Sequence, residues 1–239
     1  MAQEFTHVAT GGTDAIAREN ARFMGKVYLW MTVGIFLTAL VSEYTAQTPE
    51  VLEFVLGNRG VFWALIIAQL AAVFTLSIAF KKLSALMCTA IYLLYAGLTG
   101  LTLSTIFLVY ARESITQVFG VTCFAFGGLS AFGYFTKRDL GPVGSFCTMG
   151  LFGLIGVGLI SLIFPSLMGS TAQMVYSLCG LVIFSGLTAY DTQKIKAMNV
   201  IGNEGTAEDQ KEAIFGALVL YLDFINLFLM LLRLMGRRK

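Results

Sequence analysis

The sequence predicts an all-α protein that crosses a membrane seven times. Of its 239 residues, 57% are hydrophobic and 13% are charged, and the mean hydropathy of +0.78 lies above the range of soluble globular proteins. Seven separate stretches are apolar over about 20 residues, the length that an α-helix needs to span the hydrocarbon layer. A helix bundle in lipid satisfies these observations, because helices pair all their backbone groups internally.

The seven predicted spans follow one another in chain order. They are 24–44, 61–80, 83–110, 118–135, 143–164, 172–190 and 213–235. The third is long enough to tilt or kink, and a bend is expected near Gly97 and Gly100. Most connections are short, but the polar stretch 191–212 is long and is expected to be a mobile loop. A polar N-terminal tail, 1–23, and a basic C-terminal tail, 236–239, flank the transmembrane domain, 24–235.

Basic residues are concentrated on one side of this alternating path, which predicts the orientation. Arg59 and Arg112 lie on the sparse side. The positive-inside rule therefore places the N-terminus in the cytoplasm, and seven crossings place the C-terminus outside. The basic residues of the tail oppose this orientation, and a re-entrant last segment is the alternative. The basic side collects Arg18, Arg22, Lys26, Lys81, Lys82, Lys137, Arg138, Lys194, Lys196 and Lys211.

Composition argues against several classes of function. His7 is the only histidine, so a Ser/His or Cys/His catalytic pair and a histidine metal site are not expected. We expect no enzymatic activity, no bound cofactor and, without a basic groove, no nucleic-acid partner. Four single cysteines without CxxC spacing are expected to be small buried residues: Cys88, Cys123, Cys147 and Cys179.

Glycine is frequent in the fourth and fifth predicted helices. Small residues at such positions allow helix backbones in a membrane to approach closely. No strand precedes these glycines and no lysine follows them at P-loop spacing, so a nucleotide-binding loop is not indicated. We expect close helix packing at Gly127, Gly128, Gly133, Gly150, Gly153, Gly156 and Gly158.

Asp223 lies about halfway along the last apolar stretch, 213–235. A charged residue at the bilayer centre costs about 2.5 to 3.5 kcal/mol on insertion scales. Asp223 is therefore expected to face a protein interior or a wet cavity and to have a partner, and a structural hydrogen bond to a neighbouring helix is the simpler alternative. Asn226 follows one turn later and can donate to the carboxylate.

Asp191 is the strongest candidate partner of Asp223. It ends a weakly polar stripe of the sixth predicted helix that also contains Thr188. The predicted depths oppose a contact, because Asp191 lies at a helix end whereas Asp223 lies about 15 Å into its helix at 1.5 Å per residue. The two can meet only if one of the helices continues beyond its apolar window. A solvated helix-end residue is the alternative for Asp191.

Two carboxyl groups in one partly dry site cannot both ionise cheaply, so the pair is expected to share a proton and to respond to pH. Such oxygen ligands suit Ca²⁺, but two carboxylates fall short of the 6 to 8 oxygens of a tight calcium site. Weak, transient binding of Ca²⁺ is therefore expected at Asp191 and Asp223.

Glu43 is a candidate for an outer mouth, with a solvated helix end as the alternative. Lys81 and Lys82 are topology charges or ion-pair partners of the aspartates.

Four segments carry a resemblance to a known family. They are LTAYDTQKIK at 187–196, LYLDFINLFLMLLR at 220–233, YAGLTGLTLS at 95–104 and TKRDL at 136–140. They resemble the Bax inhibitor-1 family, also called the transmembrane Bax inhibitor motif proteins, and its bacterial branch most of all. The resemblance extends from about Arg22 to the end of the chain, and the two aspartate-bearing segments are its specific part.

The resemblance implies a bundle in which the last helix is central and the other six surround it. It also implies a pH-sensitive Ca²⁺ leak controlled by a pair of aspartates, which correspond here to Asp191 and Asp223. In the family a basic residue at the end of the second helix latches onto the first of these aspartates. Lys81, followed by Lys82, occupies this place where an arginine would fit the pattern, and lysine lacks the bidentate geometry of arginine.

Two other functions are compatible with the sequence. The protein could regulate a membrane partner, because the family is named for suppressing cell death and a bacterial relative associates with a membrane-anchored protease. Residues 1–20 and 199–212 would then carry the contact. Proton-coupled transport of an organic solute is the second. In all cases the lipid bilayer of the bacterial inner membrane is the expected location.

Overall fold

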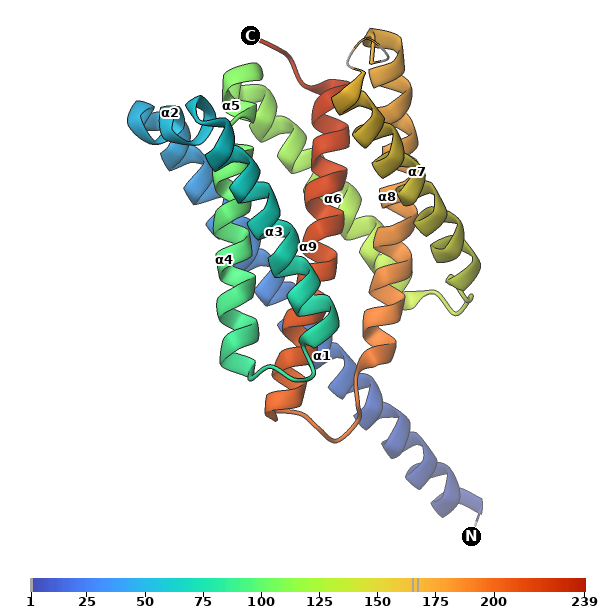
Figure 1. Ribbon diagram of the computed structural model, residues 1–239. Coiled ribbons are helices and arrows are strands. Elements are labelled where there is room, and N and C mark those ends of the chain that lie inside the picture. Colours follow the sequence, from blue (N-terminus) through green and yellow to red (C-terminus); the bar gives the residue numbers. More distant parts are fainter. Residues whose placement is uncertain (1, 165, 167) are drawn as a thin grey trace. The chain divides into compact units, whose positions relative to one another are not determined.

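The structure is a computed structural model that describes residues 2–164, 166 and 168–239, and every named element in these residues is a helix (Figure 1). The predicted all-α class is therefore confirmed. The helices are α1 (Ala2–Gln47), α2 (Pro49–Gly57), α3 (Arg59–Ala79), α4 (Ala85–Leu103), α5 (Ile106–Val109), α6 (Arg112–Phe135), α7 (Gly141–Ile163), α8 (Ser170–Met198) and α9 (Ala207–Met235).

Seven stretches of helix in the described residues are long and apolar enough to cross a membrane, and each contains or overlaps one predicted span. They are α1 from Ala15 onward, α3, α4 together with α5, and α6 to α9. α9 is one unbroken helix of 29 residues, which is long enough to cross and does not require a re-entrant turn. In its apolar window 72% of the residues are buried, against 11% to 39% in the other spans. A central last helix requires such burial.

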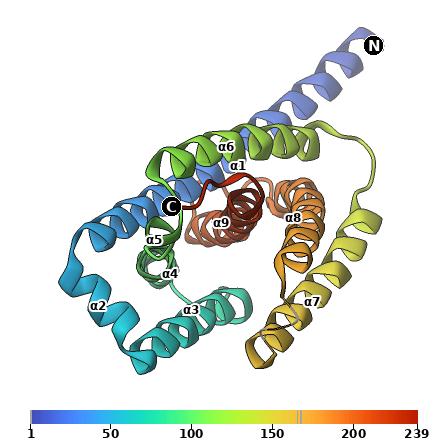
Figure 2. The ribbon, with the colours of Figure 1, turned by 90° about the horizontal axis from the view of Figure 1, so that it is seen from above.

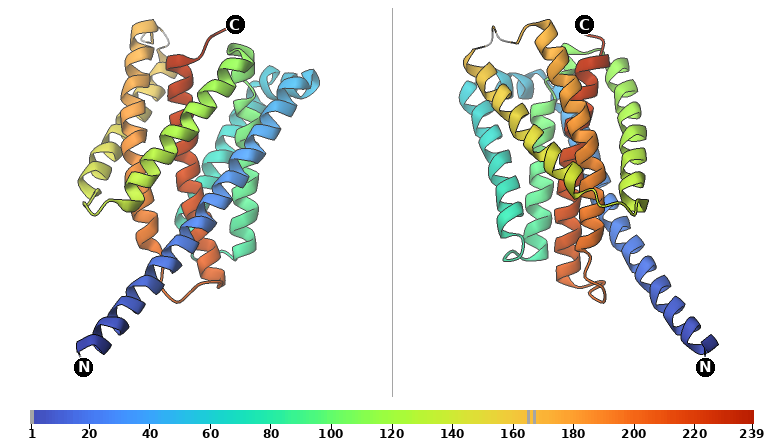
Figure 3. Two further views of the ribbon diagram at one scale, coloured as in Figure 1. Left: turned by 180° about the vertical axis from the view of Figure 1, so that it is seen from behind. Right: turned by 90° about the vertical axis from the view of Figure 1, so that its right-hand side faces the viewer.

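Several boundaries differ from the predicted ones. The polar residues 2–23 form the first half of α1 and continue without a break into its apolar half (Figure 3). The third span is interrupted at Ser104–Thr105, beyond the predicted bend near Gly97 and Gly100. The prediction of a loop over 191–212 is wrong, because only 199–206 connects α8 to α9. Hydropathy identifies only the part of a helix that is apolar enough for lipid. These helices continue beyond that part as turns of polar residues, so their ends differ from the predicted ones.

The chain divides into two compact units, which are described separately. The first contains α1 up to Thr45, Pro49–Thr102 and Ile195–Leu218. In this unit α1 packs against α4, where Thr38 Oγ1 donates to Ala96 O at 2.8 Å and Tyr92 OH donates to Trp30 O at 2.9 Å. These hydroxyl groups join two helices through backbone carbonyls, a common way of linking helices in lipid.

The second unit contains 46–48, Leu103–Lys194 and Val219–Lys239. α7 lies beside α8 (Figure 2), and Ser130 of α6 shares a hydrogen bond of 2.8 Å with Thr192 of α8. The Phe224 ring of α9 meets the Phe119 and Phe126 rings of α6 edge to face, with centroids 5.5 Å apart in both pairs. The aromatic contacts fix α6 against the α9 turn that carries Asp223.

Only part of the predicted glycine packing is found. A Cβ on Gly133 would meet the Ala189 backbone, and one on Gly150 would lie 2.7 Å from Ile183 Cδ1. Gly158 makes only ordinary contact. Gly127, Gly128, Gly153 and Gly156 have nothing within 4 Å of a Cβ, so the prediction is wrong for these four. Glycine count does not reveal which face of a helix meets a neighbour, and the close contacts at Gly144, Gly180 and Gly186 were not predicted.

The cysteine prediction holds for two of four residues. Cys88 and Cys147 are buried, whereas Cys123 and Cys179 are exposed. Large apolar side chains such as Phe124 and Ile78 are also exposed on the described helices. In a membrane protein this surface faces lipid, which is as apolar as the interior. A small apolar residue such as cysteine can therefore lie on the lipid-facing surface as well as in the core.

The basic C-terminal tail is bound to the α5–α6 connection. Ala111 N donates to Arg237 O and Lys239 N donates to Val109 O, each at 3.0 Å, around an antiparallel bridge between Tyr110 and Arg238. Arg237 N also donates to Ser114 Oγ at 2.9 Å. The tail is thus an ordered strap within the second unit.

Removal of residues 237–239 is expected to destabilise the protein. Three hydrogen bonds of the tail backbone are lost, each worth about 0.5 to 1.5 kcal/mol. The melting temperature measured by intrinsic fluorescence should therefore fall by several degrees. A variant with Arg237→Ala and Arg238→Ala keeps these backbone bonds and should melt close to the wild type. Equal melting of the truncated and full-length chains would contradict the strap.

Candidate functional site

The structure brings Asp191 and Asp223 together. α8 continues to Met198, so Asp191 lies about two turns inside the helix rather than at its end, and both aspartates belong to the second unit. Their carboxyl groups lie close enough to interact directly. The predicted obstacle of unequal depth is therefore removed by the longer α8.

One oxygen of the Asp223 carboxyl group lacks a hydrogen-bond donor in the described part of the chain. Its residue is 5% exposed, and its buried Oδ2 receives no hydrogen bond from an N–H or O–H group of the described residues. Asp191 is half-buried. Two carboxyl groups form a hydrogen bond only when one of them carries the proton that is donated. A hydrogen bond between Asp191 and Asp223 therefore requires a proton on one of the two carboxyl groups.

Nearby polar side chains are engaged elsewhere. Thr188 Oγ1 donates to Phe184 O at 2.7 Å. Asn226 Nδ2 donates to Leu222 O at 2.8 Å, so the predicted donation from Asn226 to Asp223 is not made. Both donors bond a carbonyl four residues earlier in their own helix, a frequent alternative for side chains in lipid. Thr188 and Asn226 thus lie one turn from Asp191 and Asp223 along their helices, and each is hydrogen-bonded to its own helix.

Lys194 is the charged neighbour of Asp191, three residues later in α8. Its Nζ also lies 5.7 Å from the centroid of the Tyr190 ring. Sequence reasoning placed Lys194 among the topology charges only, although its i,i+3 spacing from Asp191 could have indicated the pair. The Ser130–Thr192 hydroxyl bond beside the site was also missed, because nothing in the sequence relates α6 to α8.

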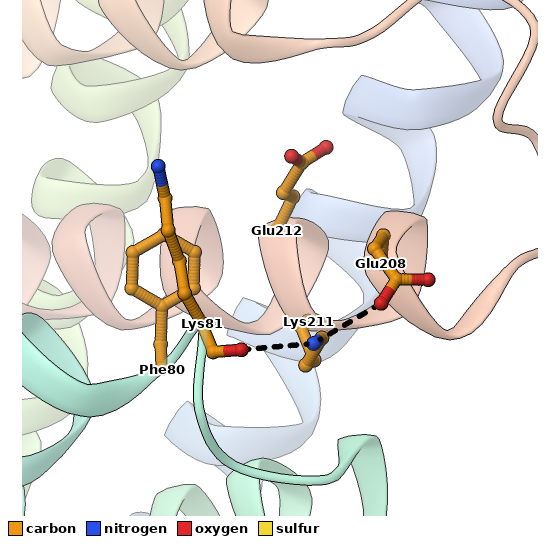
Figure 4. A pocket seen from close by; sticks show the side chains of 5 residues that line it. All are labelled: Phe80, Lys81, Glu208, Lys211 and Glu212. Atoms are coloured by element: carbon orange, nitrogen blue, oxygen red, sulfur yellow. Dashed lines mark hydrogen bonds and ion pairs between the residues drawn. The ribbon is translucent and has the colours of Figure 1, made fainter.

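The predicted latch residues lie in the first unit. Lys81 Nζ is 6.0 Å from the centroid of the Phe80 ring, and Lys81 O accepts a hydrogen bond from Lys211 Nζ at 3.4 Å (Figure 4). Neither Lys81 nor Lys82 forms an ion pair with a carboxylate in the described part of the chain. A latch from Lys81 or Lys82 to Asp191 stays a prediction.

Glu43 is half-buried near the end of α1, and its role at an outer mouth also stays a prediction.

Metal ions in proteins are held by sets of several ligand side chains. No group of three or more His, Cys, Asp or Glu side chains within residues 2–164, 166 and 168–239 could hold a metal ion. Weak binding of Ca²⁺ at Asp191 and Asp223 stays a prediction.

Comparison with known proteins shows the family of the chain. A family model described as inhibitor of apoptosis-promoting Bax1 matches residues 20–239. The chain belongs to the Bax inhibitor-1 family. This family member is 47% identical to inner membrane protein YbhL of Escherichia coli over 231 residues, which cover 95% of the chain and 97% of YbhL. It is also 40% identical to an uncharacterized protein of Borreliella burgdorferi over 218 residues, 91% of the chain and 93% of that protein.

The match covers both aspartate-bearing helices, so the family assignment does not depend on one motif. A third similar protein, from Deinococcus radiodurans, is 38% identical over 216 residues and 90% of each chain. The predicted resemblance is therefore confirmed, and this Bax inhibitor-1 family protein is a protein of the lipid bilayer, with seven helical stretches in its described residues that can cross a membrane.

Proposed function

We propose that the protein is a pH-sensitive cation leak, most readily for Ca²⁺, controlled by the Asp191–Asp223 pair. The observation that carries this proposal is the contact between two carboxyl groups, one of them buried in a membrane-spanning helix. With a shared proton the pair has reduced charge and joins α8 to α9. Without the proton it repels itself and attracts a cation.

The remaining residues support this role without covalent chemistry. Lys194 adds a positive charge next to Asp191, which limits how strongly a cation is held and favours its release. Lys81 or Lys82 would act as a latch in one state, more weakly than an arginine because lysine is a point charge. The proposed location is the inner membrane, as the name of YbhL states for that relative, with the N-terminus in the cytoplasm and the C-terminus outside.

Calcium flux into proteoliposomes tests the proposal. Wild-type protein should carry a Ca²⁺ flux that changes with pH, and the double variant Asp191→Asn with Asp223→Asn should carry a flux that does not. Asp139 is exposed and outside the site, so Asp139→Asn is a matched control that should behave as wild type. Equal, pH-independent flux from the wild type and the double variant would exclude the proposed mechanism.

A second candidate is a regulator that binds another membrane protein, such as a membrane-anchored protease or a stress factor. It is favoured by Val200 and Ile201, two apolar side chains that are 55% and 47% exposed in the otherwise polar α8–α9 connection. Replacement of both by serine should then abolish stoichiometric co-purification of the partner from native membranes. Retention of the partner by this variant would count against the contact.

A further inference from the structure

One face of α1 holds the connection between α8 and α9, within the first unit (Figure 3). Four side chains over two turns of α1 make these contacts, and their partners lie in the connection 199–206 or in the first turn of α9. We call the eight residues the clasp. Glu19 Oε1 accepts from Gly202 N (2.6 Å), Asn199 Nδ2 donates to Asn20 Oδ1 (2.9 Å), Arg22 Nη1 donates to Glu204 Oε2 (3.0 Å), and Lys26 Nζ donates to Asp209 Oδ2 (2.6 Å).

Asp209 is the centre of the clasp. Its side chain is 4% exposed, and its Oδ2 accepts hydrogen bonds from both Lys26 Nζ and Gly205 N, the latter at 2.8 Å. Its own N–H donates to Thr206 Oγ1 at 3.2 Å, which caps the start of α9. Gly205 and Gly202 have positive φ angles of 82° and 93°, which other residues rarely adopt. One buried carboxylate therefore joins α1, the connection and α9.

The opposite side of the same α9 segment is also held. Lys211 Nζ donates to Lys81 O and pairs with Glu208 at 3.3 Å (Figure 4). Phe215, one turn later, stacks on Phe80 with ring centroids 4.8 Å apart. The first turns of α9 are thus held by α1 on one side and by the end of α3 on the other.

The two ion pairs of the clasp differ in their surroundings. The Arg22–Glu204 pair is exposed, at 64% and 38%, and such pairs contribute little in water. The Lys26–Asp209 pair combines a 36% exposed lysine with an almost fully buried aspartate. Loss of Lys26 would leave a buried carboxylate without its cation, which is far more disruptive than loss of an exposed pair.

We propose that Lys26 and Asp209 are positioning residues that set how far α8 and α9 can separate at the aspartate pair. This inference rests on the proposed function. Asp191 and Asp223 lie in two continuous helices joined by only the residues 199–206. This connection is the direct covalent link between α8 and α9, and the clasp ties it to α1. Loosening the clasp shifts the balance between the joined and the separated aspartates.

Electron–electron double resonance measures the distance between α8 and α9 next to their connection. Ala197 of α8 and Gln210 of α9 are exposed and flank the connection, so both can be replaced by spin-labelled cysteine in a chain whose four native cysteines are alanine. Lys26→Met and Asp209→Asn should each broaden the distance distribution and shift the midpoint of its pH dependence by about half a unit or more. Lys26→Arg keeps the charge and should restore the wild-type distribution. Arg22→Met is the matched control and should change little.

Each outcome decides a separate claim. An unchanged distance distribution in Lys26→Met and Asp209→Asn would show that the clasp does not restrain α8 and α9. A broader distribution with the wild-type pH midpoint would overturn its effect on the aspartate pair, and so would failure of Lys26→Arg to restore the midpoint. The distances do not depend on ion flow, so a wild type without Ca²⁺ flux would overturn the proposed function alone.

Discussion

Asp223→Asn is expected to abolish the pH dependence of Ca²⁺ flux and to weaken Ca²⁺ binding. Asparagine has the shape of aspartate but cannot take up or release a proton, and it leaves Asp191 as the single carboxylate of the site. In the wild type Ca²⁺ and the proton compete for the same oxygens, so lowering the pH should weaken the apparent affinity for Ca²⁺. Flux and binding titrations between about pH 6 and about pH 8 measure both effects.

The fold should tolerate this change. The side-chain amide that Asp223→Asn introduces can donate to the Asp191 carboxylate, so the unfolding free energy should change by only about 1 kcal/mol. Asp139→Asn again serves as the control, because it removes an exposed carboxylate from the same unit. A variant that folds as wild type and retains the wild-type pH profile would show that the proton is held elsewhere.

Gly133→Ala is expected to give the largest loss of stability among glycine-to-alanine substitutions in α6. A Cβ at this position would meet the backbone of Ala189 in α8, which cannot move aside as the end of a side chain can. Overpacking of this kind costs about 1 to 3 kcal/mol. Because Ala189 lies two residues before Asp191, the displaced α8 should also disturb the aspartate pair.

Gly127→Ala is the matched control for Gly133→Ala. Gly127 lies in the same helix and has nothing within 4 Å of a Cβ, so alanine should be neutral or slightly stabilising there. Thermal unfolding in the same detergent compares the two variants. Similar melting temperatures for both would mean that α6 and α8 are not in close contact at Gly133.

Much of the fold could be predicted from the sequence, because lipid imposes a simple requirement on a helix. Apolar stretches of about 20 residues locate each span, and all seven spans are confirmed. The helix ends could not be predicted in this way. α8 and α9 continue for two turns or so outside their apolar windows, where polar contacts such as Lys26–Asp209 replace the lipid.

The two aspartates could be found from the sequence, since a carboxylate in a membrane span is costly and needs a reason. Their neighbours could not. The role of Asn226 was inferred from one-turn spacing, but its amide bonds the backbone of its own helix. The clasp was not foreseen either, because Asn20 and Asn199 are 179 residues apart and no local pattern relates them.

Infrared spectroscopy of the carboxyl groups tests the shared proton most directly. A protonated carboxyl group has a C=O stretching band that a carboxylate lacks, and a difference spectrum between two pH values separates this band from the ester bands of the lipid, which do not change with pH. Near neutral pH, where exposed carboxyl groups are ionised, the wild type should show one such band that disappears as the pH is raised. Asp139→Asn should retain this band near neutral pH, and Asp223→Asn should lack it there. A band that persists unchanged in Asp223→Asn, or a wild type without any band, would contradict a proton shared between Asp191 and Asp223.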